Sequence, residues 1–260
     1  MPRRIDSPTN AIIARARSLR DSRRRRWLER AFLVEGPRFI ADFLAAGLEP
    51  EQLFLGDGLE LEDSLRSRSH VEVSDRVLAD ISTTEHGQGA VAIFPFPALG
   101  LRRGLPTLLL LLDRVQDPGN AGTLIRSAAA SGADGIWFTP GAADPFNPKV
   151  IRAAAAAHVA IDLGVGPAED LMGRGLRLVV SDADVAATSL DDVDWTIPSI
   201  VALGNEGAGV SVELRERADL TVAIPISPSV ESLNVGVAGS IILFEAARQR
   251  RIRGTPSHGR

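Results

Sequence analysis

The sequence contains no cysteine among its 260 residues. This absence excludes disulfides, thiolate metal sites and thiol nucleophiles, and it is consistent with a reducing compartment. No apolar secretory segment follows Met1, and no run approaches the roughly 20 apolar residues that a membrane helix requires. Since 45% of the residues are hydrophobic, the chain can bury a core, and we expect a cytoplasmic protein without a membrane partner.

The net charge of -4 conceals an uneven distribution of charge. Ten arginines, including the run 23–26, fall within residues 1–30 against three acidic residues, so this segment carries +7 and the remainder -11. Clustered guanidinium groups displace condensed counterions from phosphate backbones. The basic segment therefore suggests a polyanionic partner such as RNA, although the same pattern is also typical of a solvated helix face.

The first hundred residues predict a small α/β domain. Apolar periodicity indicates helices over 7–30, 37–46 and 75–81, and strands over 31–35, 52–55, 71–73 and 90–94. Prolines and glycines then interrupt any regular element between Pro95 and Pro106. The predicted organisation is a domain at 1–98, a linker at 99–106 and a second α/β domain at 107–260.

The stretch from Leu108 to Phe138 predicts a strand–helix–strand unit. Leu108–Leu112 is too short an apolar run for a helix and indicates a buried parallel strand, and Gly135–Phe138 indicates the next one. Between them we expect a helix with Asn120 as its N-cap and Gly132 as its C-cap. Ligands of open α/β sheets collect at the carboxyl ends of strands, so the DPGN turn before this helix is a candidate site.

Two further glycine- or proline-containing loops follow apolar strands in the same way. GNEGAG follows the predicted strand Ile200–Leu203, and ISPSVESLN follows Leu220–Ile224 and leads into a helix over Val235–Arg250. Elsewhere the pattern indicates a strand over Leu176–Ser181 and a helix that begins at Pro148 in PKVIRAAAAAHV. The loops match neither the phosphate-binding P-loop nor the G-x-G-x-x-G fingerprint, and any one of them alone is more often a structural turn.

Gly236 and Gly239 lie inside the predicted last helix, where each glycine costs about 1 kcal/mol relative to alanine. Their presence indicates that something approaches the helix closely. The neighbour could be a ligand, a second copy of the chain in a symmetric contact, or the helix's own sheet.

The three loop segments together resemble a known family. In order and spacing over residues 108–250, DRVQDPGNAGTLIRSAAASGADGIWF, VALGNEGAGVS and IPISPSVESLNVGVAGSIILFEAARQR resemble the three motifs of the SpoU (TrmH-type) RNA ribose methyltransferases of the SPOUT superfamily. More loosely, FLVEGPRFI and STTEHGQGAVAIF resemble the ribosomal-protein-like substrate-binding domain often fused ahead of it.

The resemblance implies a 2′-O-methyltransferase that uses S-adenosyl-methionine. It also implies a parallel-sheet domain with a C-terminal trefoil knot, which general topology rules would not predict, and an active site completed across a homodimer. The implied partner is RNA, with large-subunit (23S) ribosomal RNA first and transfer RNA second.

The resemblance further assigns roles to individual residues. Cofactor binding, largely through the backbone, maps to Leu203, Gly204, Ile224, Ile226 and Leu233. Activation of the ribose hydroxyl maps to Arg126, which stays protonated and is therefore expected to polarise the hydroxyl or orient a phosphate. The other catalytic candidates are Asn120, Glu206, Ser232 and Asn234.

These candidates also have simpler explanations from the residues alone. Asn120, Ser232 and Asn234 lie where helix caps are expected, Arg126 is a solvated helix residue, and Glu206 is an exposed loop acid. In the family interpretation, the Glu206 carboxylate could position Arg126 or Asn120 by a charge-assisted hydrogen bond.

One departure from the family pattern concerns the helix after N-P-K-V. Ala154 and Ala156 stand where relatives usually have a serine and a glycine, which puts any polar contact from this helix in doubt. His158 has no second histidine nearby, and we expect no metal.

Two other classes remain open at this point. A dinucleotide-dependent oxidoreductase would use Asp182 or Asp184 as a ribose ligand, but the fingerprint glycines are missing. A non-catalytic RNA-binding protein would have lost the residues that the motifs retain.

Overall fold

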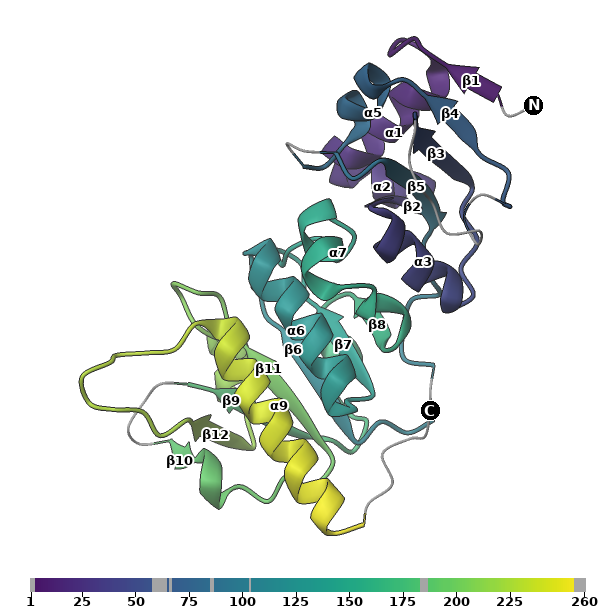
Figure 1. Cartoon of the computed structure of the whole chain (residues 1–260). Coiled ribbons are helices and arrows are strands. Elements are labelled where there is room, and N and C mark those ends of the chain that lie inside the picture. Colours follow the sequence, from purple (N-terminus) through teal and green to yellow (C-terminus); the bar gives the residue numbers. More distant parts are fainter. Residues whose placement is uncertain are drawn as a thin grey trace. The chain divides into compact units, whose positions relative to one another are not determined.

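The computed structural model describes residues 3–57, 65, 67–84, 87–102, 104–182 and 187–254 (Figure 1). Contacts divide the chain into two compact units. Met1–Ala98 and Phe146–Val159 form the first unit, and Leu99–Pro145 and Ala160–Arg260 form the second. The segment Phe146–Val159, which lies inside the predicted second domain, thus groups with the first unit.

The first unit contains a five-stranded mixed sheet. In spatial order its strands are β1 (Arg3–Ile5), β4 (Val71–Val73), β3 (Gln52–Gly56), β5 (Ala90–Pro95) and β2 (Ala31–Glu35). Strand β5 runs antiparallel to both of its neighbours, and the other pairs are parallel. Among the described residues of this unit the α-helices are α1 (Ala11–Asp21), α2 (Arg23–Glu29), α3 (Pro37–Ala45), α5 (Asp75–Ile81) and α7 (Pro148–Ala154). The single helix predicted over 7–30 is wrong, because Ser22 is extended, ends α1 and caps α2.

The two faces of this sheet carry different cores. One face is aliphatic and packs Ile13 and Leu19 of α1 and Val77 and Ile81 of α5 onto the strands. The other face is aromatic: Phe32, Phe43, Phe94, Phe96 and Phe146 form a cluster of ring contacts. His158 is 1% exposed and joins this cluster, so it is a packing residue.

The alanine-rich helix α7 is shorter than predicted. It ends at Ala154, and Ala155 and Ala156 adopt left-handed backbone angles with φ of 48° and 61° before a 3₁₀ turn at Ala157–Val159. A left-handed conformation costs an L-residue about 1–2 kcal/mol. Tertiary packing therefore outweighs both this cost and the helix propensity of alanine here. The turn carries His158 into the aromatic cluster, and Ala156 holds the position at which the family pattern has glycine.

Most of the basic segment is neutralised within the first unit. Arg4 pairs with Asp57 at 2.7 Å, Arg15 pairs with Glu51 at 2.6 Å, and Arg17 pairs with Asp80. Arg26 is buried and donates to the carbonyls at the end of α1, at 2.7 Å to Leu19 O and 2.9 Å to Arg20 O. The run 23–26 is therefore not a uniformly solvated patch.

The second unit is built on a seven-stranded sheet in which all neighbours are parallel. The spatial order is β10 (Thr188–Ser189), β12 (Leu220–Ala223), β9 (Arg177–Ser181), β11 (Ser199–Leu203), β6 (Leu108–Leu112), β7 (Gly135–Phe138) and β8 (Asp162–Val165). The predicted α/β class with a parallel sheet is confirmed. Because parallel strands end at the same edge, the loops after β6, β11, β9 and β12 are brought together.

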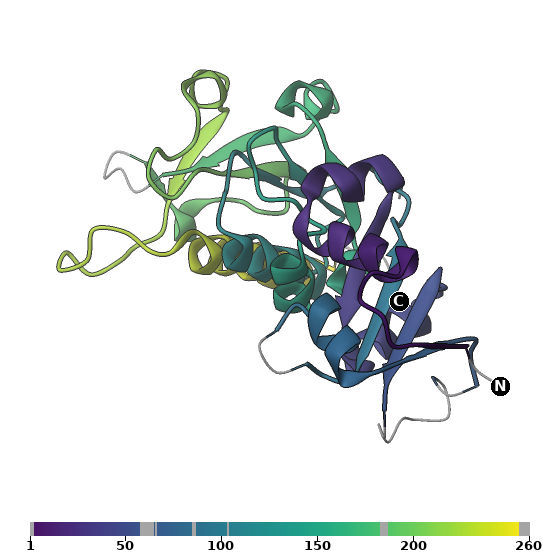
Figure 2. The ribbon, with the colours of Figure 1, turned by 90° about the horizontal axis from the view of Figure 1, so that it is seen from above.

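Helices cover both faces of this sheet (Figure 2). Helices α6 (Pro118–Ser131) and α9 (Val235–Ile252) lie side by side on one face, and α8 (Val212–Glu216) and a 3₁₀ helix at Ala168–Leu171 lie on the other. Arg250 near the end of α9 donates to Thr107 O at 2.7 Å and to Trp195 O at 2.8 Å, which anchors the helix beside the start of β6.

The two glycines of α9 are explained by packing within the chain. A Cβ on Gly239 would lie 2.4 Å from both Leu124 Cδ2 and Leu203 Cδ1, and one on Gly236 would lie 3.3 Å from Asn120 Oδ1. Both glycines are buried against α6 and β11. A seam between two copies is therefore the wrong explanation for these glycines.

The predicted linker is attached to the second unit. Gly100 N donates to Leu163 O of β8 at 2.8 Å, and Leu101 packs on the core of the seven-stranded sheet. Residues 100 and 101 thus continue along the edge of that sheet.

Candidate active site

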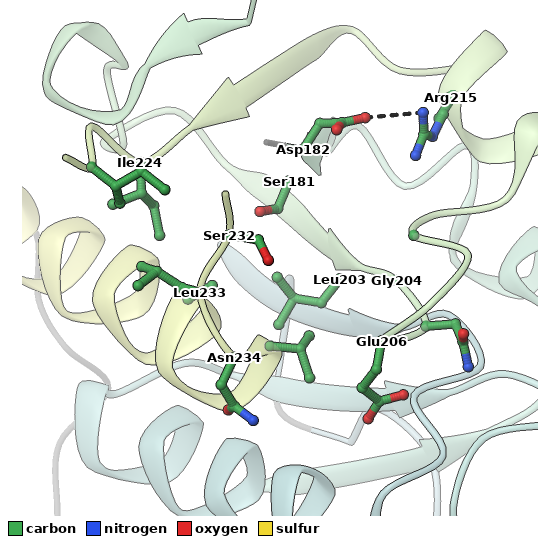
Figure 3. A pocket seen from close by; sticks show the side chains of 15 residues that line it. Ser181, Asp182, Leu203, Gly204, Glu206, Arg215, Ile224, Ser232, Leu233 and Asn234 are labelled. Atoms are coloured by element: carbon green, nitrogen blue, oxygen red, sulfur yellow. Dashed lines mark ion pairs between the residues drawn. The ribbon is translucent and has the colours of Figure 1, made fainter. Parts of the chain in front are cut away.

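A cavity of about 420 Å³ opens at the carboxyl ends of β9, β11 and β12 (Figure 3). Its walls come from strand ends, from the loop after β11 and from the start of α9. The lining residues are Ser181, Asp182, Leu203, Gly204, Asn205, Glu206, Gly209, Arg215, Ile224, Ile226, Ser232, Leu233, Asn234, Val235 and Ala238. A volume of this size lies within the range of small-molecule sites.

The apolar part of the cavity is formed by the aliphatic residues assigned to the cofactor. Leu203, Ile224, Ile226 and Leu233 all line it, and so does Gly204. At Gly204 only glycine fits, since a Cβ would lie 2.0 Å from the Gly209 carbonyl carbon and from Val210 N. This close approach arises because the chain turns back on itself through a bridge between Asn205 and Gly209.

A chain of side-chain hydrogen bonds beside the cavity joins the first turn of α6, the loop after β11 and the N-cap of α9. Asn120 donates through Nδ2 to Glu206 Oε1 at 3.0 Å, and Asn234 donates through Nδ2 to Asn120 Oδ1 at 2.9 Å. Asn234 also caps α9, because its Oδ1 accepts from Gly236 N at 2.9 Å. Three predicted site residues from distant parts of the sequence are therefore in direct contact.

Backbone groups complete the surroundings of Glu206. Its carboxylate accepts from Gln116 N at 3.3 Å and from Asp117 N at 3.2 Å. Burial raises the pKa of Glu206, but the hydrogen bonds from Asn120 and from these backbone groups outweigh it, so the pKa is lowered. Glu206 therefore carries a negative charge at neutral pH.

The cap of α6 differs from the prediction. Asp117, not Asn120, is the N-cap, and its Oδ1 accepts from Asn120 N at 2.8 Å. Pro118 then occupies the first helical turn, where its missing N–H costs nothing. Because Asp117 takes the capping role, the Asn120 side chain is available to link Glu206 with Asn234.

Two of the predicted catalytic residues stand apart from this chain of hydrogen bonds. Ser232 is exposed and lines the cavity. Arg126 is exposed on α6, does not line the cavity, and has no hydrogen bond or ion pair with another residue that the structure describes. The structure thus groups Asn120, Glu206, Ser232 and Asn234 but leaves Arg126 on the outer face of α6.

An ion pair at the cavity wall was missed as a site feature. Asp182 directly follows β9 and pairs with Arg215 at 3.0 Å. Sequence reasoning considered Asp182 and Asp184 only for an oxidoreductase, and it gave Arg215 no role. Asp184 lies outside the described residues. The available signal was the position of Asp182 at the end of an apolar strand.

Other kinds of site find no support in the part of the chain that the structure describes. No group of three or more histidine, aspartate or glutamate side chains there could hold a metal ion. Among the described helices, none has the length and apolar character needed to cross a bilayer.

Known proteins match both units. The SpoU rRNA Methylase family matches residues 107–244, and the MRM3-like substrate binding domain matches residues 10–92. An uncharacterized tRNA/rRNA methyltransferase of Synechocystis is 33% identical over 97% of this chain and 96% of its own length. The 23S rRNA (guanosine(2553)-2′-O)-methyltransferase of Bacillus subtilis is 28% identical, covering 93% of this chain and 98% of that protein.

A solved structure is similar over nearly the whole chain. The SpoU methyltransferase AviRb from Streptomyces viridochromogenes, in complex with the cofactor AdoMet (S-adenosyl-methionine), has a TM-score of 0.84 and 29% identity over 93% of this chain and 98% of that one. The family match, the parallel sheet and the grouped motif residues agree. The chain belongs to the SpoU rRNA Methylase family of S-adenosyl-methionine-dependent RNA methyltransferases.

Proposed function

We propose that this chain transfers a methyl group from S-adenosyl-methionine to a ribose 2′-hydroxyl of large-subunit ribosomal RNA. The observation that carries the proposal is the convergence of Asn120, Glu206 and Asn234 beside a cavity of about 420 Å³. The similarity to a 23S rRNA 2′-O-methyltransferase supports the choice of ribose and of ribosomal RNA.

The residues that line the cavity are chemically suited to the cofactor. Four aliphatic side chains form an apolar surface suited to adenine, and Gly204 lets a ligand approach the backbone closely. The Glu206 carboxylate, with its lowered pKa, supplies a negative charge at the cavity wall. When bound, S-adenosyl-methionine supplies a methyl group on a positively charged sulfur, and a fixed carboxylate is complementary to that charge.

The residues around the cavity act mainly by holding geometry. Glu206 fixes Asn120 from one side and Asn234 fixes it from the other, so the loop after β6 and the start of α9 keep one arrangement. Alignment of a donor with an attacking oxygen can contribute several kcal/mol to catalysis. Arg126 cannot serve as a simple base because it stays protonated, and we assign it to orienting RNA or polarising the hydroxyl.

A homodimer accounts for the place of Arg126. On α9, Val237, Ile241 and Phe244 form an exposed apolar stripe at helical spacing, with exposed fractions of 47%, 38% and 47%. A symmetric contact through this stripe would cover it. We propose that Arg126 of one copy serves the cavity of the other, which explains its distance from the cavity lining in its own chain.

Subunit complementation tests this arrangement. Arg126→Ala and Glu206→Gln should each reduce methyl transfer by about tenfold or more. Random mixing after denaturation and refolding should restore about a quarter of the wild-type activity if the two residues act in different copies, since half the dimers are mixed and each has one intact site. No recovery despite mixed dimers would place both residues in one chain. Arg126→Ala should leave cofactor affinity within a few-fold.

The knot stays a prediction. The segment 224–234 between β12 and α9 lines the same cavity as the loop after β11, which is the arrangement that a threaded chain would need.

RNA binding by the first unit is supported by its match to a substrate-binding domain. Arg23, Arg24 and Arg25 are exposed on α2, whereas Arg26 is buried and belongs to the core. Replacing the three exposed arginines with serine should weaken RNA binding and flatten its salt dependence, and Arg26 must be left intact. An unchanged salt slope would remove α2 from the RNA contact.

Two measurements test the activity and its target. S-adenosyl-homocysteine should raise the thermal midpoint and NAD should not, and the reverse would exclude this assignment. Mapping ribose methylation in RNA from a strain that lacks the gene should reveal a missing 2′-O-methyl group in large-subunit ribosomal RNA. A missing group in transfer RNA would redirect the proposal to that substrate.

A further inference from the structure

Two carboxylates line the cavity, and only one has a role so far. Glu206 is bound by Asn120 and by the backbone of residues 116 and 117. Asp182 lies on another wall, formed by the end of β9 and by Arg215, and Figure 3 shows this pair apart from Glu206 and Asn234. The described structure thus has a second anionic group that faces the ligand space.

Arg215 holds this carboxylate from a rigid support. Its Nε donates to Val210 O at 2.9 Å, and its NH1 group lies 3.0 Å from Asp182 Oδ2. The guanidinium also lies against Gly209, where an added Cβ would come within 2.6 Å of it and where φ is +69°. The loop after β11, which lines the cavity through Gly204, therefore also supports the side chain that orients Asp182.

We propose that Asp182 accepts hydrogen bonds from the ribose hydroxyls of the bound cofactor, with Arg215 as the residue that positions it. The inference rests on the proposed placement of S-adenosyl-methionine in this cavity. A carboxylate offers about four acceptor positions, so it can serve Arg215 and a ligand together. In other nucleotide-binding α/β folds an acid near the end of a strand binds a ribose hydroxyl in this manner.

The chemistry of the walls favours the ribose over the methionine ammonium. Ribose hydroxyls are neutral, so they can bind Asp182 while its ion pair with Arg215 stays intact. Adenine is attached directly to the ribose, and the aliphatic surface of Ile224 and Leu233 lies across the same cavity. One bound nucleoside can therefore place its ribose against Asp182 and its adenine against the aliphatic surface.

Calorimetric titration with three ligands tests this assignment. S-adenosyl-homocysteine carries the ribose and the amino acid, 5′-methylthioadenosine lacks the amino acid, and 2′-deoxy-S-adenosyl-homocysteine lacks one hydroxyl. Asp182→Ala should weaken binding of the first two by the same factor, about tenfold or more. Loss of the 2′-hydroxyl should weaken binding to the wild type about tenfold but should change binding to Asp182→Ala little.

Two further variants separate positioning from folding. Arg215→Ala should reduce the same discrimination between the normal and the 2′-deoxy ligand. Arg217→Ala removes an exposed cation of the same segment, which lies 3.9 Å from Glu169 and does not line the cavity, and this variant should behave as the wild type does. Thermal midpoints will show whether each variant is folded.

The outcomes are distinct. An equal 2′-hydroxyl effect in the wild type and in Asp182→Ala overturns the inference while the cofactor site stands. A loss confined to S-adenosyl-homocysteine also overturns it and assigns Asp182 to the ammonium group. If the wild type binds none of the ligands, the proposed cofactor site itself is wrong.

Discussion

Each unit uses a glutamate near the end of a strand to hold a neighbouring loop, but the two glutamates differ in what surrounds them. Glu35 ends β2, is 7% exposed, and accepts from Ser82 Oγ at 2.6 Å, Thr83 N at 2.6 Å and Gln88 N at 3.2 Å. The cavity beside it measures about 10 Å³, room for one water at most. Glu206 follows β11, is exposed and borders a cavity of about 420 Å³.

The comparison indicates that the Glu35 carboxylate is structural, whereas the Glu206 carboxylate is placed to meet a ligand. In both cases burial raises the pKa and hydrogen bonds lower it by more, so both side chains are charged. The acceptor positions of Glu35 are taken up by the neighbouring loop that contains Ser82, Thr83 and Gln88. Those of Glu206 are shared between its loop contacts and an open space, which suits a group that meets a charged ligand.

Removing the charge of Glu35 should give the largest effect. Glu35→Gln leaves the amide nitrogen facing buried donors, so we expect the free energy of unfolding to fall by about 3 kcal/mol. Urea denaturation measures this change. Asp42→Asn, an exposed acid on α3, is the control and should stay within about 0.5 kcal/mol of the wild type. Overlapping curves for Glu35→Gln and the wild type would mean that the charge is not needed.

Removing the charge of Glu206 should affect activity more than folding. Glu206→Gln turns an amide nitrogen toward backbone donors or toward Asn120, and we expect methyl transfer to fall about 10- to 100-fold. Single-turnover kinetics with saturating RNA measures the effect. Glu213→Gln on α8 is a nearby exposed control outside the cavity and should retain activity. A large loss of thermal stability would instead make Glu206 a second structural carboxylate.

The pH dependence of stability should also distinguish Glu35 from Glu206, with a smaller effect. The pKa of Glu35 lies below its ordinary value of 4.5, so its contribution to stability is complete above about pH 5 and is lost as pH falls through the lowered pKa. The stability difference between wild type and Glu35→Gln should therefore shrink below pH 4.5. Glu206→Gln should alter this acid profile less, because solvent screens an exposed group. A constant difference down to pH 3 would contradict the assignment.

The smallest effect is expected in Phe146–Val159, a segment from the middle of the chain that belongs to the first unit. Ala156→Gly should stabilise the protein by about 1 kcal/mol, since glycine adopts positive φ without strain. Ala154→Gly, two residues earlier inside α7, should instead destabilise by about 1 kcal/mol. Paired thermal unfolding curves measure both changes, and equal signs would mean that the left-handed turn is not strained.

The regular elements were predictable where one apolar period dominates. Leu108–Leu112 and Gly135–Phe138 have the predicted bounds as β6 and β7, and α9 begins at Val235 as expected. The sequence did not reveal β8, because Asp162 and Gly164 interrupt its short apolar pattern. The sequence also did not predict that α7 ends at Ala154, because the packing of His158 overrides the helix propensity of alanine.

The site was predictable in its residues and less so in its contacts. Motif resemblance named Asn120, Glu206 and Asn234, but that their side chains form one chain depends on strand order and on Asp117 taking the cap. The position of Asp182 after an apolar strand was the one signal for its ion pair, and the sequence did not indicate Arg215 as the partner, since charged residues so far apart in the sequence usually lie on the surface.

The residues that line the cavity come from two stretches of the sequence, one between Ser181 and Arg215 and a later one between Ile224 and Ala238. During synthesis on the ribosome, the nascent polypeptide cannot form this cavity until residue 238 has left the exit tunnel. A cofactor that recognises the finished walls would then bind only chains whose translation has passed that point.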